Sequence, residues 1–323
     1  MKKNTRNILI GIGAAAAGIG VLTALSYSIT KKLMKIAMDR ETPKAMKKSK
    51  EKLAGSPQMA EFIDAVLKAE EKLKSRENET VEIESRDGLR LVGHWIECEN
   101  AKRVIVAMHG WRSSWAQDFG TIADFWYDSG CSVLYAEQRG QGESDGEYMG
   151  FGMLERYDTL SWINWVNERT GGSLPVYLGG VSMGATTVLM AAGLELPGNV
   201  KGIVADCGFT SPHAIWKHVV ENNLHIPYSL HAAAASDLCK KRINMGAEEY
   251  STIDAMKQCT VPVLFIHGTD DKFVPIEMTY ENYKACASDK ELLVVPGAGH
   301  GMSYFTDPEK YKKAVTDFCR RLD

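Results

Sequence analysis

The sequence predicts an α/β protein in which helices cover both faces of a mostly parallel sheet. Short, continuous apolar runs recur after residue 80, and segments of helical length separate most of them. Such an alternation is typical of parallel strands that are buried on both faces. Of the 323 residues, 45% are hydrophobic and 24% are charged, which excludes a disordered chain. The formal net charge of −3 lacks the basic excess of a polyanion-binding protein, so we expect no nucleic-acid partner.

The first element is a run of 22 uncharged residues from Ile8 to Ile29. At about 1.5 Å per helical residue it reaches about 33 Å, enough to cross a bilayer. We therefore expect residues 1–30 to form an uncleaved transmembrane anchor in contact with membrane lipid. A cleaved secretory signal and a buried core helix are the alternatives.

A basic segment follows the apolar run. Nine Lys or Arg residues lie between Lys31 and Lys52, which predicts that this side of the membrane is the cytoplasm. Seven widely spread cysteines without a CxxC pair fit reduced thiols in the same compartment. The sequence thus predicts a single-pass membrane protein with a cytoplasmic body. Within the segment 31–80, residues 57–76 place Phe62, Val66 and Leu73 at helical spacing, which indicates an amphipathic helix against that body.

The body spans residues 81–323, and eight runs in it are suited to strands. They are 81–84, 89–96, 103–108, 132–136, 175–178, 200–205, 261–266 and 291–295. The first two alternate and flank Asp87-Gly88, the pattern of a hairpin. More than 50 residues separate the sixth and seventh runs. We interpret approximately 209–258 as an inserted helical cap.

A nucleophile motif lies between the fifth apolar run and a helix-forming segment. Gly180-Val181-Ser182-Met183-Gly184 fits the pattern G-x-S-x-G, which exposes a serine on a sharp turn from strand to helix. The pentapeptide at 142–146 matches equally well, but its Ser144 lies in a polar, glycine-rich loop. Context therefore indicates Ser182 as the nucleophile.

An acid and a base follow later in the chain, each after its own apolar run. The seventh run ends in Asp270-Asp271 and the eighth leads to His300. Their order and their position at strand ends suit a Ser-Asp-His triad. Over about residues 80–323 the chain resembles the α/β-hydrolase superfamily. The resemblance implies Asp271 as the acid and His300 as the base, with Asp270 and Asp206 as alternatives.

The same resemblance extends to a loop after the third run. His109-Gly110-Trp111 is similar to the H-G-x loop of that superfamily, which implies that the backbone amides of Trp111 and Met183 form an oxyanion hole. We expect His109 to be structural. In the cap, Ile215, Trp216, Val219 and Val220 are candidates to line an acyl channel, with cap packing as the alternative. The cap histidines have no metal-ligand spacing, so we expect no metal, and the reaction needs no cofactor.

These observations predict an α/β-hydrolase fold with an eight-stranded, mostly parallel sheet and a helical cap. The resemblance implies a serine hydrolase that forms an acyl-enzyme, with a small acyl compound or a short peptide as its substrate. We expect carboxylic-ester hydrolysis; serine peptidase or aminopeptidase activity and acyl transfer are the alternatives. A membrane-tethered binding module without turnover is the alternative from another class. The sequence leaves the oligomeric state open.

Overall fold

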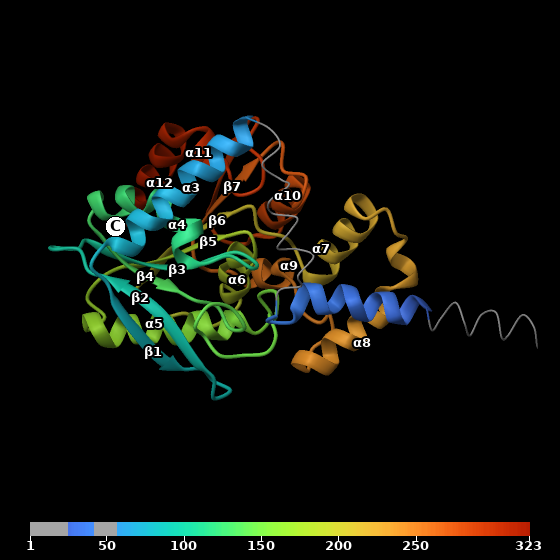
Figure 1. The fold of residues 1–323 in the computed structure, drawn as a ribbon. Coiled ribbons are helices and arrows are strands. Elements are labelled where there is room, and N and C mark those ends of the chain that lie inside the picture. Colours follow the sequence, from blue (N-terminus) through green and yellow to red (C-terminus); the bar gives the residue numbers. More distant parts are fainter. Residues whose placement is uncertain (1–24, 42–56) are drawn as a thin grey trace, which may run out of the picture.

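The computed structural model describes residues 25–41 and 57–323. Its centre is an eight-stranded sheet with the strand order β1-β2-β4-β3-β5-β6-β7-β8 (Figure 1). The strands are β1 (Glu79–Glu84), β2 (Arg90–Ile96), β3 (Arg103–Met108), β4 (Cys131–Ala136), β5 (Val176–Val181), β6 (Val200–Asp206), β7 (Val263–Gly268) and β8 (Lys290–Val295). The predicted eight-stranded sheet is confirmed, and every strand lies within three residues of its expected bounds.

The sheet is antiparallel at one edge and parallel elsewhere. β1 pairs with β2, and β2 pairs with β4, in antiparallel register. The β1–β2 hairpin turns at Gly88, whose φ of 83° favours glycine. All pairs from β4 through β3 to β8 are parallel. The carboxyl ends of six strands therefore meet at one edge, where open α/β sheets build their sites.

Helices cover both faces of the sheet (Figure 1). One core joins the sheet to the helices α5 (Glu155–Thr170), α6 (Met183–Ala191), α9 (Thr252–Gln258) and α10 (Ile276–Ala285). A second core joins the opposite face to α3 (Pro57–Ser75), α4 (Trp115–Asp128) and α12 (Pro308–Leu322). The short helix α11 (Ser303–Thr306) leads into α12. The edge at which the carboxyl ends of the strands meet thus belongs to a sheet that helices bury on both faces.

A cap projects from the sheet between β6 and β7. It contains α7 (Pro212–His218), a π-helical turn at Val219–Asn223, a short 3-10 turn at Tyr228–Leu230, and α8 (Ala232–Ile243). The helix over residues 25–38 lies beside α8 in Figure 1. Its buried Met34 and Met38 share a core with the cap residues Trp216 and Leu238. The N-terminal helix, the cap and buried residues of the body such as Met190 and Met278 thus share one apolar core.

The helix over residues 25–38 requires a correction. It contains the last residues of the predicted transmembrane run, but it packs on the cap, and Thr30 Oγ1 lies 2.8 Å from His231 Nδ1. Nowhere in residues 25–41 and 57–323 is there a helix of the length and apolarity needed to cross a bilayer. The prediction of a single-pass membrane protein is wrong on this finding, and contact with membrane lipid is not supported. The start of the run, residues 8–24, lies outside the described residues.

The chain after this helix ties the N-terminal segment to the body. Asp39 forms a β-bridge with Tyr148, and the Arg242 guanidinium pairs with the Asp39 carboxylate at 3.0 Å. The Arg40 guanidinium donates to the carbonyls of Ser144 and Gly142. Residues 38–41 thus bridge the cap and the loop that follows β4.

The seven cysteines that the sequence left unpaired are all buried as free thiols. They are Cys98, Cys131, Cys207, Cys239, Cys259, Cys286 and Cys319. Free cysteine is among the residue types most often found in protein interiors. These cysteines are therefore explained as small apolar side chains of the core.

Candidate active site

Ser182 lies at the sharp turn between β5 and α6. Its φ of 55° and ψ of −117° are an uncommon conformation for a residue with a side chain. Neighbouring glycines make the turn possible: a Cβ on Gly184 would collide with the carbonyl of Met108, and one on Gly180 with the backbone of Gly184. The turn places Ser182 at the carboxyl edge of the sheet, only 6% exposed. This geometry fits the expected nucleophile elbow.

Three predicted residues from three strand ends meet in one hydrogen-bonded chain. His300 Nε2 lies 2.9 Å from Ser182 Oγ, and His300 Nδ1 lies 2.7 Å from Asp271 Oδ2. The other Asp271 oxygen accepts the backbone amides of Phe273 and Val274, each at 2.9 Å. Serine, imidazole and carboxylate are therefore arranged for proton transfer from the hydroxyl to the ring.

The environment of Asp271 favours its ionised form. Burial, the largest single influence, would raise its pKa, but hydrogen bonds from His267 and His300 hold the pKa well below its usual range. His267 was not assigned a role from the sequence. Its Nε2 lies 3.3 Å from Asp271 Oδ2 and 2.9 Å from the carbonyl of Val274. The sequence offered one clue to its contact with the acid: His267 lies at the end of β7, four residues before Asp271.

The two alternative acids are engaged elsewhere. Asp270 is exposed, and its Oδ1 accepts the Thr269 hydroxyl at 3.0 Å. Asp206 is buried at the end of β6, and its Oδ1 accepts the Ser303 hydroxyl at 2.9 Å. Burial raises the pKa of Asp206 to about 6, although the bond from Ser303 opposes the shift. Within the part of the chain that the structure describes, His300 bonds to the carboxylate of Asp271 and to neither of these two.

The amides of Trp111 and Met183 are available to a developing oxyanion. Met183 is the first residue of α6, so its N–H has no partner within the helix. Among the described residues, no hydrogen bond occupies either amide. The loop is held from several sides: Gly110 N donates to Asp118 Oδ2 at 2.6 Å, and Trp111 Nε1 donates to the Ala37 carbonyl at 2.7 Å. The N-terminal segment therefore supports the loop that carries one of the two donors.

Two side chains of catalytic type serve the surrounding loops instead. The Ser144 hydroxyl donates to the Glu137 carbonyl at 2.6 Å and accepts the Val92 amide at 2.9 Å. His109 is fully buried, and its Nε2 accepts the Gln138 amide at 3.2 Å. Both side chains thus stabilise backbone at the site edge, as expected from the sequence.

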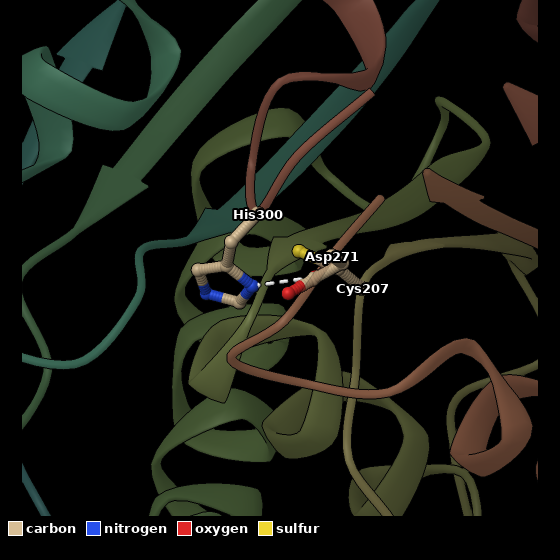
Figure 2. A group of neighbouring side chains, drawn as sticks. All are labelled: Cys207, Asp271 and His300. Carbon is tan, nitrogen blue, oxygen red and sulfur yellow. Dashed lines mark hydrogen bonds and ion pairs between the residues drawn. The ribbon is translucent and has the colours of Figure 1, made fainter. Parts of the chain in front are cut away.

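Cys207 lies beside the triad, as Figure 2 shows. Its sulfur, an Asp271 carboxylate oxygen and a His300 ring nitrogen all lie within 4.8 Å of one another. Metal binding here would have to break the 2.7 Å bond between His300 and Asp271 and deprotonate the thiol. Burial raises the pKa of the Cys207 thiol well above its ordinary value, which opposes deprotonation. The grouping is better explained by the triad itself.

A cavity of about 530 Å³ adjoins Ser182 and His300. Residues of α3, α4, α11 and α12 line it, on the face of the sheet that carries the second core. The predicted pocket residues Ile215, Trp216 and Val219 are not among its lining residues. Ile215 and Trp216 are buried in the core that the cap shares with the body, and the Trp216 ring packs edge-on against Phe151 at 5.2 Å. The packing of Ile215 and Trp216 thus favours the alternative, that these residues hold the cap in place.

Comparisons with known proteins agree with this fold. Residues 99–234 match the family described as serine aminopeptidase, S33. The chain is 26% identical over 257 residues to the uncharacterised protein YqkD of Bacillus subtilis, which covers 78% of this chain and 83% of that protein. It is also 26% identical to the alpha/beta hydrolase domain-containing protein 17B of Xenopus tropicalis, over 72% of this chain and 74% of that protein.

Solved structures show the same architecture. An esterase of Pyrococcus furiosus superposes with a TM-score of 0.64 at 23% identity, covering 78% of this chain and 93% of that chain. An acylaminoacyl peptidase of Pyrococcus horikoshii superposes with a TM-score of 0.58 at 17% identity, covering 78% of this chain and 43% of that chain. The chain thus has the α/β-hydrolase fold, and the match of residues 99–234 to the serine aminopeptidase family supports a serine hydrolase of that fold.

Proposed function

We propose that the protein hydrolyses carboxylic esters through Ser182, His300 and Asp271. The observation that carries the proposal is the continuous chain of hydrogen bonds from Ser182 Oγ through both nitrogens of His300 to Asp271. A serine hydroxyl is a weak nucleophile unless a neighbouring base takes its proton and a third group orients that base. All three groups are within hydrogen-bond reach of their partners.

In the first half of the reaction, Ser182 Oγ attacks the ester carbonyl carbon while its proton passes to His300 Nε2. The carbonyl oxygen becomes an oxyanion, which the amides of Trp111 and Met183 stabilise. Asp271 stays ionised because of its lowered pKa, and it stabilises the imidazolium. His300 then protonates the departing alcohol oxygen, and the acyl group remains on Ser182.

The second half repeats these steps with water as the nucleophile. His300 Nε2 takes a proton from water, the hydroxide attacks the acyl carbon, and the same two amides stabilise the second oxyanion. Return of the proton to Ser182 releases the carboxylic acid and restores the site. Each residue therefore acts twice, and the reaction needs no group beyond this chain and water.

The proposal is tested by ester hydrolysis with the purified full chain and p-nitrophenyl acetate. Ser182→Ala should lower kcat by about 10⁴-fold or more, because the triad acts as a unit. Ser173→Ala is a suitable control, since Ser173 is an exposed loop serine whose hydroxyl donates to the Thr170 carbonyl. Equal hydrolysis by the Ser182→Ala variant and the wild type would refute the proposed nucleophile, and no hydrolysis by either protein would favour a binding module.

Amide hydrolysis is the second candidate, favoured by the match to the serine aminopeptidase family and by the likeness to an acylaminoacyl peptidase. The same triad would serve, with an amine in place of the alcohol as the leaving group. Aminoacyl p-nitroanilides assayed beside p-nitrophenyl esters distinguish the two. We expect a higher kcat/KM for the esters, and the reverse order would establish the peptidase alternative.

A further inference from the structure

The cavity beside Ser182 extends under α3 and away from the cap. Its floor includes Val181 and Val204 of the central strands, and α3 contributes Phe62 and Val66. Its volume of about 530 Å³ lies within the range of about 300–1,000 Å³ that is usual for small-molecule sites. A substrate bound at Ser182 therefore has room on the α3 side of the sheet.

One half of α3 is fixed firmly to α4. The two helices cross so closely that a Cβ on Gly120 would lie 2.6 Å from the backbone of Ala69. Leu73 is 2% exposed, and the Arg76 guanidinium that follows α3 lies 2.8 Å from the Asp124 carboxylate. These contacts set the height at which the other half of α3 passes over the cavity.

The other half of α3 forms an apolar roof. Phe62 meets Phe305 of α11 edge-on, with ring centroids 5.2 Å apart. Both rings and Val66 line the cavity and remain half-buried. Leu67, the next residue of α3, points to solvent and is 58% exposed. The helix thus presents Phe62 and Val66 to the cavity and Leu67 to water.

The walls below the roof are mostly apolar and aromatic. They include Phe119, Ile122, Trp126 and Tyr304. The acidic groups on the lining have protein partners: Asp118 accepts Gly110 N and the Ser113 hydroxyl, and Asp206 accepts the Ser303 hydroxyl. An apolar ligand therefore gains from burial here, whereas a charged one has to compete with bonds already made.

We propose that this cavity holds the acyl chain of the substrate, and that Phe62 and Val66 of α3, not the cap, determine which chain lengths are accepted. The inference rests on the proposed function, because the acyl group has to be attached to Ser182. The lining includes Ser182 and Trp111, which supply the nucleophile and one oxyanion donor in the proposed mechanism. The substrate class is thus an ester of an aliphatic acid with a chain longer than acetyl.

The test compares kcat/KM for p-nitrophenyl acetate, hexanoate and decanoate with the full chain. Val66→Phe fills the space under the roof, and it should lower the ratio of decanoate to acetate at least tenfold, since one methylene in a tight pocket already changes rates by about 10-fold or more. Leu67→Phe adds the same ring on the exposed face and should keep the wild-type ratio. Phe62→Ala adds no bulk and instead removes apolar contact from the roof. It should therefore also lower the ratio of kcat/KM for decanoate to that for acetate.

Fluorophosphonate labelling of Ser182 separates the two levels of the proposal. If labelling persists while Val66→Phe and Phe62→Ala keep the wild-type ratio, the acyl cavity is refuted and the hydrolase is not.

Esters with a constant acetyl group and alcohols of increasing length form a second series of substrates. If the two variants change rates in that series alone, the assignment of the cavity to the acyl chain is refuted. A preference for aminoacyl over alkanoyl esters would refute the apolar class. A wild-type serine that is not labelled would overturn the proposed function and this inference together.

Discussion

Replacing Asp206 with Asn should change how the stability of the protein depends on pH. Burial raises the pKa of Asp206 from 3.8 to about 6 in the folded protein, so between these values the folded state binds more protons than the unfolded state. The free energy of unfolding then falls as the pH rises through this range. A shift of about two pH units at 1.36 kcal/mol each gives a loss of about 3 kcal/mol above pH 6.

Asp206→Asn removes this titration and keeps an oxygen to accept the Ser303 hydroxyl. The stability difference between variant and wild type should therefore grow by about 3 kcal/mol in favour of the variant from pH 3 to pH 7. Urea unfolding followed by circular dichroism at several pH values measures it. Ser303→Ala removes a bond that lowers the Asp206 pKa, so it should move the loss of stability to higher pH. Parallel curves for Asp206→Asn and wild type would refute the reasoning.

Three further substitutions test neighbouring parts of the account. Asp271→Asn should lower kcat for ester hydrolysis by about 10⁴-fold, because it misorients His300, and a near-normal rate would contradict this. Ser144→Ala should lower the free energy of unfolding by about 1–3 kcal/mol, since it leaves buried backbone groups unpaired, but keep the rate within about tenfold; a larger loss of rate would indicate a catalytic serine. Trp216→Ala should destabilise the cap by about 3–5 kcal/mol in urea unfolding and leave relative rates across acyl chain lengths unchanged; altered relative rates would restore the cap channel.

The sheet could be predicted because each strand carries its own local signal. The runs at 103–108 and 261–266 are apolar, rich in β-branched residues and bounded by turn residues. These local features were sufficient to predict that both runs are strands. The candidate serine, acid and base followed from the same signal, because strand ends of a parallel sheet meet at one edge, but the choice of Asp271 over Asp270 came from the resemblance to the α/β-hydrolase superfamily. His267 lies at the end of β7 as well, but its contact with Asp271 depends on the loop geometry between the two residues.

Tertiary contacts account for what the sequence did not predict. The apolar spacing of Ile215 and Trp216 indicated burial, but it carried no information on whether a ligand or the cap covers them. The roof of the cavity depends on the crossing of α3 and α4 at Gly120, which no local pattern reveals. The transmembrane prediction failed for a related reason. Hydropathy did not reveal that residues 25–38 pack on the cap through Met34 and Met38.

The central claim is that Ser182 is the serine activated by His300, and covalent labelling tests it most directly. The full chain is treated with a fluorophosphonate, and the modified residue is mapped by mass spectrometry. We predict a label on Ser182 that is lost in Ser182→Ala and strongly slowed in His300→Ala, because an isolated serine hydroxyl is a weak nucleophile. A label on Ser144, or one that persists in Ser182→Ala, would contradict the account.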